Sequence, residues 1–298
     1  MPNTAQTKSP TAKLLPCLLI LLQSLLYGFG DPISKVAYDA VPVYSLLTVR
    51  YFIAFVCLCL IGGRDVMADL KTAPVKAWLP PSLCIACCYV SGNVALKLTA
   101  ATSVAFLRSL STVMTPVLAL LFFRRRLGRK HIPIQLLVVA GLYLLCGYGG
   151  LSGFGMGEIL SLVTALLMAG ALTFGQNALR DMRPLTLTAV QAGASALVAG
   201  LCALLLDGGF DLSAATPTVW GIIVYLAIAC TAAGYLLQNT ALRTVPAKTV
   251  ALVQCACPVL TAVFSFFILN ERLTAAGLIG SGIILLCVMG EVLLEDDK

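Results

Sequence analysis

Charged side chains are scarce in this chain, and their scarcity excludes most soluble architectures. Only 11% of the 298 residues are Asp, Glu, Lys or Arg, whereas 59% are hydrophobic, and the mean hydropathy is +0.96. Soluble domains carry roughly 25% charged residues, so these few charges could not cover a soluble surface. The sequence therefore predicts an all-α membrane protein with the lipid bilayer as its surroundings.

Residues that serve catalysis, metal binding or nucleotide hydrolysis are also missing. The chain has one histidine, His131, and no P-loop, which argues against metal chemistry and against ATP-driven transport by this chain alone. Cys84, Cys87 and Cys88 look like a metal motif, but no second Cys-x-x-Cys knuckle accompanies them, so we interpret the 12 cysteines as packing residues. We expect no enzyme activity, no cofactor and no metal. The net charge of +7 lies at the ends of apolar runs, so we expect no nucleic acid partner.

Ten apolar segments follow a short polar N-terminus, and a spanning helix needs about 20 such residues. Nothing after the first segment resembles a signal-peptide cleavage site, so we interpret that segment as the first span. The predicted spans are 14–37, 43–61, 78–97, 103–123, 132–150, 157–177, 185–206, 217–239, 248–269 and 275–293.

The placement of Lys and Arg predicts the orientation of these spans, because cytoplasmic loops are enriched in both. With the N-terminus inside, 15 of the 20 basic residues fall on the cytoplasmic side, and only Lys35, Lys97 and Arg272 fall outside. The remaining two, Arg50 and Arg108, lie within apolar runs. This alternation predicts ten transmembrane helices with both termini in the cytoplasm.

The spans divide five and five at a Gly-rich segment, Gly147–Gly157. We expect a cytoplasmic tail at 1–13, a first repeat at 14–150, a second at 151–293 and a cytoplasmic tail at 294–298. Each repeat has an odd number of spans, so the two must have opposite orientations, which is a common plan of secondary transporters. The matching segments, in constant register, are Asn93–Leu96 with Asn239–Leu242, Ser103–Leu107 with Thr249–Val253, and Arg126-Leu127 with Arg272-Leu273.

Short motifs also follow one another along the chain in a fixed order. They are Tyr27-Gly28 followed by Lys35, Arg50 before an apolar run, Thr115-Pro116, Gly157-Glu158 at a helix start, and Asn270-Glu271-Arg272-Leu273-Thr274. In this order they resemble the drug/metabolite transporter superfamily in its EamA-type branch, over nearly the whole chain. One departure is Arg124-Arg125-Arg126, which stands where the first half of the family has an acid.

The resemblance implies alternating access around a central cavity between the two halves. Members of this family move amino acids, other metabolites, drugs or sugar-nucleotide-like solutes, and many bacterial ones are exporters. We therefore expect a secondary transporter that exports a small metabolite, as a multi-pass protein of the bacterial inner (plasma) membrane. The alternatives are a multidrug or organic-cation exporter, a channel or sensor, and, least favoured, a membrane enzyme that acts on lipid.

Two arginines inside spans are the leading candidates for the substrate site, because intramembrane charges are costly and usually functional. Arg50 and Arg108 lie roughly 10 Å and 8 Å from the outer ends of their helices. Arginine suits a carboxylate or phosphate, which favours an anionic or zwitterionic solute. A structural interpretation stays open for both, in which they reach the outer headgroups or pair with Asp31 or Asp39.

The repeat register extends the candidate site. Arg108 aligns with Gln254, and Gln191 lies near the place that mirrors Arg50. Pro116 and Pro258 lie inside helices and are hinge candidates, although a packed kink explains them equally well. Gly141, Gly147, Gly277, Gly280 and Gly282 suit close helix packing or a homodimer contact. The candidate substrate-binding residues are Arg108, Arg50, Gln254, Gln191, Tyr27, Tyr89 and Asn93.

Acidic residues are expected only near the ends of the spans, with Asp31 and Asp39 at outer ends. Buried carboxylates are the usual proton relays of coupled transporters. The absence of acidic residues from the middle of the spans favours a facilitator or exchanger over a proton-coupled pump. The same absence disfavours a cationic substrate.

Overall fold

The structure is a computed structural model that describes residues 11–124, 131–144, 155–271 and 274–293, and these residues form helices and short connections with no strand. In lipid, a helix satisfies its own backbone groups, which is why the apolar segments are helical. The first half contains α1 (Thr11–Tyr38), α2 (Val43–Thr72), α3 (Val75–Leu98), α4 (Ala101–Ser109), α5 (Ser111–Phe123) and α6 (His131–Leu142).

The second half follows the same plan with one further interruption. A π-helix stands between α9 and α10, in a segment that the sequence predicts as one continuous span. The elements are α7 (Met156–Ala178), α8 (Pro184–Leu206), α9 (Pro217–Tyr225), η2 (Leu226–Ala233), α10 (Gly234–Thr244), α11 (Ala247–Val253), α12 (Ala256–Leu269) and α13 (Ala275–Leu293).

Eight of the predicted spans are long and apolar enough to cross a membrane, among the described residues. The other two correspond to shorter apolar helices, Ile132–Leu142 and Ala275–Gly290. Residues 145–150 of the predicted span 132–150 lie outside the described residues. So do the predicted repeat boundary at 150 and the terminal segments 1–10 and 294–298.

Helix α2 is longer than the apolar run at 43–61 predicts. The chain leaves helical geometry at Gly62 (φ −134°, ψ 21°) and then continues as a charged helix to Thr72. Asp69 on this extension accepts hydrogen bonds from Arg183 and Thr186 at the start of α8. The hydrogen bonds of the Arg183 side chain to Asp69 and to Asp65 raise the pKa of its guanidinium above the ordinary value. The extension therefore ties α2 to α8 beyond the apolar segment.

Several helix ends in the first half have a counterpart in the second half. The two members of each pair are as many residues apart as Asn93 and Asn239. Helices α3 and α10 end at matching positions, α4 and α11 begin at matching positions, and α5 and α12 end at matching positions. Both α5 and α12 end in a left-handed residue, Arg124 (φ 51°) and Asn270 (φ 55°). These two are the only non-glycine residues with positive φ among those described. These helix boundaries thus match in the register that the sequence shows.

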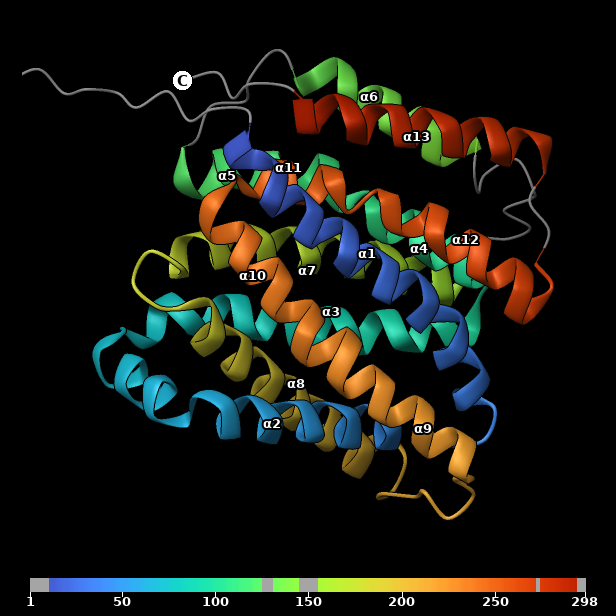
Figure 1. Ribbon diagram of the computed structural model, residues 1–298. Coiled ribbons are helices and arrows are strands. Elements are labelled where there is room, and N and C mark those ends of the chain that lie inside the picture. The colour runs from blue at the N-terminus through green and yellow to red at the C-terminus, as the bar shows by residue number, and fades with distance from the viewer. Residues whose placement is uncertain (1–10, 125–130, 145–154, 272–273, 294–298) are drawn as a thin grey trace, which may run out of the picture.

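The two halves pack into one interlocked bundle (Figure 1). Helix α1 contacts α10 and α12 of the second half, and α7 contacts α3, α4 and α5 of the first. Helices α2 and α8 lie side by side at the bottom of Figure 1, and α6 and α13 lie side by side at the top. Gly141 allows the close approach of α6 to α13, since a Cβ there would lie 3.1 Å from the Gly280 carbonyl oxygen. This glycine therefore serves packing within the chain.

Candidate functional site

Two small adjoining cavities lie at the centre of the bundle and share Tyr27, Tyr89 and Arg108 in their walls. The first has a volume of about 30 Å³ and the second about 10 Å³. Since one water needs roughly 10–15 Å³ by this measure, the two together have room for a few waters at most. Neither cavity, as the structure has it, holds a molecule much larger than water.

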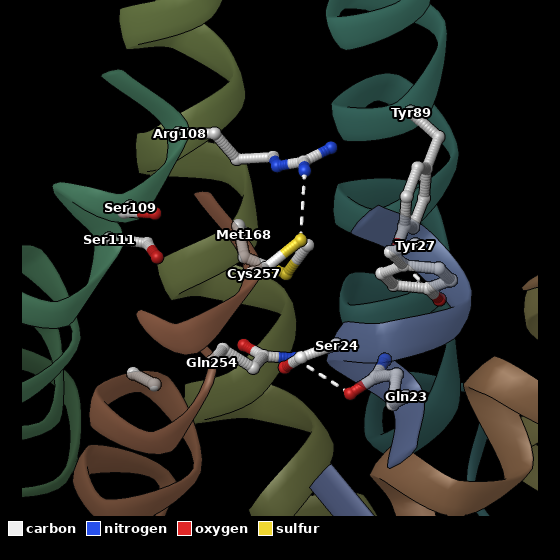
Figure 2. Close-up of a pocket in the computed structure, with 11 residues that line it drawn as sticks. Gln23, Ser24, Tyr27, Tyr89, Arg108, Ser109, Ser111, Met168, Gln254 and Cys257 are labelled. Atoms are coloured by element: carbon white, nitrogen blue, oxygen red, sulfur yellow. Dashed lines mark hydrogen bonds between the residues drawn. The ribbon is translucent and has the colours of Figure 1, made fainter. Parts of the chain in front are cut away.

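Arg108 reaches into the first cavity from the last turn of α4 (Figure 2). Its Nη2 donates to Asp31 Oδ2 at 2.7 Å, and the two side chains are only 12% and 13% exposed. The same nitrogen lies 3.6 Å from Cys257 Sγ on α12. The structural interpretation of Arg108 predicts an ion pair with Asp31, and this pair is present. The functional interpretation predicts a place in a cavity wall, and Arg108 has that place too.

Asp31 is a mostly buried carboxylate within α1, 13% exposed, and this corrects its expected position at the outer end of the span. It precedes the end of the candidate span Leu14–Tyr38 by seven residues, which is roughly 10 Å at 1.5 Å per residue. It also lines the second cavity. The premise that the spans contain no buried acid is therefore wrong for this residue.

Arg50 on α2 is 4% exposed and lines the second cavity. Its Nε donates to Thr231 Oγ1 at 2.9 Å, and its guanidinium lies 5.3 Å from the ring centre of Tyr51. No ion pair of Arg50 with another described residue is present. Thr231 belongs to η2 and donates to the Leu226 carbonyl five residues earlier, so the π-helix presents the hydroxyl that accepts from Arg50.

Gln254 stands at the break between α11 and α12, as Arg108 stands beside the break between α4 and α5. Its Nε2 donates to Gln23 Oε1 at 3.1 Å and to Gln238 Oε1 at 2.8 Å. Gln23 Nε2 also donates to Gln238, at 3.0 Å. In Figure 2, Gln254 and Gln23 lie at one end of the cavity and Arg108 lies at the other. The predicted mirror pair therefore lines opposite ends of one cavity.

Tyrosines form the wall between these ends. The Tyr89 hydroxyl donates to the Tyr27 hydroxyl at 3.0 Å, and the Tyr89 ring stacks on Tyr235 with centroids 5.2 Å apart. Tyr89 and Tyr235 occupy matching positions in the two halves, so this stack joins equivalent places. A Cβ at Gly234 would lie 2.8 Å from the Tyr27 ring, so this glycine provides the space that Tyr27 occupies.

Asn93 lines the second cavity and accepts a hydrogen bond from the Tyr38 hydroxyl at 2.5 Å. Tyr38 also lines a wider cavity of about 440 Å³, together with Asp39, Lys97 and Asp207. The Tyr38–Asn93 pair thus lies between the wider cavity, on the predicted outer side, and the central site.

Gln191 is the one predicted site residue that lines neither central cavity. It is 1% exposed and accepts a hydrogen bond from Asn239 Nδ2 at 2.8 Å. Its own Nε2 and Asn239 Oδ1 have no hydrogen-bond partner among the described residues. The structure therefore places Gln191 in a buried amide pair between α8 and α10.

The two prolines stand in different relations to the helix breaks. Pro258 lies four residues after Gln254, whose carbonyl accepts from the Cys257 amide at 2.9 Å instead. Pro116 lies inside α5, six residues after the break at Leu110, and the Thr112 carbonyl that it leaves free lies 3.4 Å from Gln135 Nε2. Proline therefore accounts for the second break and not for the first.

Sequence reasoning missed some residues of the site. The sequence suggests Asp31 only as an outer-end acid or a partner for an arginine and Cys257 only as a packing residue, and it gives no reason to single out Ser109 or Met168. The position of Asp31, at about the same depth from the outer side as both arginines, was an available signal. Cysteine, serine and methionine are ordinary in spanning helices, so nothing in the sequence distinguishes these three.

The fold and the site define a class of protein, a multi-pass helical membrane protein with charged and amide side chains around a central cavity. A family model, the EamA-like transporter family, matches residues 14–147 and again 155–291. The chain belongs to the EamA-like transporter family and is a membrane transporter.

Two further comparisons agree with this membership. The chain is similar to an uncharacterized transporter of Archaeoglobus fulgidus, with 27% identity over 271 residues that cover 91% of this chain and 83% of the relative. A second uncharacterized transporter of that organism is 27% identical over 188 residues, which cover 62% of this chain and 64% of the relative. A crystal structure of a protein 18% identical in sequence has the same fold, with a TM-score of 0.74 over 93% of this chain and 95% of that one.

Proposed function

We propose that this chain is an alternating-access secondary transporter that exports a small metabolite, an amino acid or another anionic or zwitterionic solute, across the bacterial inner membrane. The observation that carries the proposal is the pair of buried arginines in the walls of the central cavities, of which Arg50 has no acidic partner among the described residues. An unpaired buried guanidinium attracts an anion, because a buried charge without a counter-ion is costly.

The matching element boundaries support two repeats. The proposal gives these repeats opposite orientations, with ten spans and both termini in the cytoplasm, as the placement of Lys and Arg predicts. Broken helices that meet at a central site are a recurring feature of such carriers. Here Arg108 and Gln254 lie beside matching breaks, at opposite ends of one cavity. The Tyr38–Asn93 hydrogen bond would then close the outer side and would open when solute exchanges with the outside.

An exporter of organic cations is the second candidate. Asp31 now supplies the buried carboxylate that such an exporter needs, but Arg108 already neutralises it at 2.7 Å. A cation would have to displace a guanidinium and would then share the site with two arginines. The observed charges therefore favour an anion.

Counterflow in proteoliposomes tests the proposal. Liposomes that contain the purified chain are preloaded with single candidate solutes, first amino acids and organic acids, and uptake of a labelled trace is compared with empty liposomes. We expect saturable exchange of an anionic or zwitterionic solute. Exchange of organic cations alone would contradict the arginine site, and no saturable exchange of any solute would favour a channel or sensor.

A further inference from the structure

Only three charged residues line the two central cavities among the described residues: Asp31, Arg50 and Arg108. The other polar groups of the walls are neutral amides, hydroxyls and thiols. Arginine stays protonated in proteins, and Asp31 forms an ion pair with Arg108. Two positive charges and one negative charge leave the site with a single net positive charge.

The unmatched charge belongs to Arg50. Its hydrogen-bond partner, Thr231, is neutral, and the ring of Tyr51 offers only a weak cation–π attraction. A solute with one negative charge would make the buried site neutral. A dianion would leave one negative charge, an uncharged solute one positive charge and a cation two positive charges, and each of these leaves an uncompensated charge away from water.

We propose that Asp31 determines the charge selectivity of the site. By neutralising Arg108 it leaves one uncompensated positive charge, so that the carrier selects solutes with a single net negative charge. This inference rests on the proposed function and narrows its substrate class from anionic or zwitterionic solutes to monoanions. The competing explanation is that the Asp31–Arg108 pair only braces α1 against α4, and a brace affects stability without affecting charge preference.

Three solutes of nearly the same size and shape separate these explanations: succinamide, succinamate and succinate, which carry zero, one and two negative charges at neutral pH. Each is preloaded in proteoliposomes that contain the full chain, and counterflow of the same labelled solute is measured without a pH gradient. The wild-type chain should exchange succinamate at least about tenfold faster than the other two, which corresponds to ~1.4 kcal/mol. If it carries other solutes but none of these, the acid and amide forms of a solute that it does carry replace them.

Substitutions then change the net charge of the site in both directions. Asp31→Asn raises it to two and should shift the preference to succinate, whereas Arg50→Gln lowers it to zero and should shift the preference to succinamide. The double variant Asp31→Asn with Arg108→Gln returns the net charge to one and should restore the preference for succinamate. Because the double variant has no ion pair, a brace cannot explain this restoration.

The outcomes distinguish failure of this inference from failure of the proposed function. A wild-type preference for the neutral or dianionic form would overturn the inference, and so would a wild-type order that persists in Asp31→Asn. If Asp31→Asn does not fold, Arg50→Gln and the double variant decide: an unchanged order in Arg50→Gln, or a preference other than for the monoanion in the double variant, would overturn it. A wild-type chain that exchanges no solute at all would contradict the proposed function instead.

Discussion

Helix α1 approaches α12 of the second half closely at Gly28, one residue after Tyr27 of the site. A Cβ at Gly28 would lie 2.6 Å from Leu260 Cβ, 3.0 Å from the Leu260 carbonyl carbon and 3.1 Å from the Thr261 amide nitrogen. Ordinary van der Waals contact begins at 3.4 Å, and two of these three atoms are backbone. Gly28→Ala therefore forces α12 to move away from α1 by roughly half an ångström or more, since interiors have few voids that absorb such a change.

Overpacking of this kind costs about 1–3 kcal/mol, and the better helix propensity of alanine offsets roughly 0.5–1 kcal/mol of it. We expect Gly28→Ala to lower the free energy of unfolding by about 1–2 kcal/mol, measured by titration of the purified chain from mild detergent into a denaturing detergent. Gly221→Ala on α9 is the matched control, because nothing lies within 4 Å of a Cβ there. This control should be neutral or slightly stabilising. If the two variants are equally stable, α1 and α12 do not approach as closely as described.

Three further substitutions test the site by the yield of folded protein, by solute exchange and by cysteine labelling. Arg108→Gln leaves the mostly buried Asp31 unpaired, and removal of one partner of a buried pair lowers stability by about 3–5 kcal/mol. The yield of folded protein should therefore fall, and it should recover when Asp31→Asn is added. Gln254→Ala should weaken solute affinity from the inner face more than from the outer face in sided counterflow, and equal losses from both faces would contradict its mirror relation to Arg108. Tyr38→Phe removes a hydrogen bond worth about 0.5–1.5 kcal/mol and should favour opening to the outside, seen as faster labelling of an outer-cavity cysteine introduced at Val94; unchanged labelling would exclude Tyr38 as an outer gate.

The arrangement of helices followed from simple sequence features. Apolar run length located the helices, because a lipid-exposed backbone has few other ways to satisfy its hydrogen bonds. The constant register between the halves also predicted which positions correspond, and the breaks beside Arg108 and Gln254 fall at such positions. What the sequence did not show is that α2 continues past Gly62, since hydropathy measures burial in lipid and not helix length.

The site was harder to predict, because side-chain pairing depends on contacts between distant segments. Depth along a helix indicated that Arg50 and Arg108 lie inside the protein, where their side chains are mostly shielded. It could not show that Asp31 neutralises Arg108 while Arg50 has no acidic partner among the described residues. The π-helix was not predictable either, because nothing in the sequence of Leu226–Ala233 distinguishes it from an ordinary helical segment. Its effect is local but relevant, since it carries Thr231, the partner of Arg50.

The two halves share a backbone plan but divide the chemistry of the site between them. All three charged groups, Asp31, Arg50 and Arg108, come from the first half, whereas Gln238 and Gln254 of the second half supply neutral amides. An anion held by the charges would therefore stay with the first half when the halves move relative to each other. In the proposed mechanism the contacts that must break and reform then include the hydrogen bonds of the glutamine amides and those of Arg50 with Thr231 and of Arg108 with Cys257, and each costs less to break than a buried ion pair. This asymmetry would let the proposed alternating access proceed while the Asp31–Arg108 ion pair stays intact.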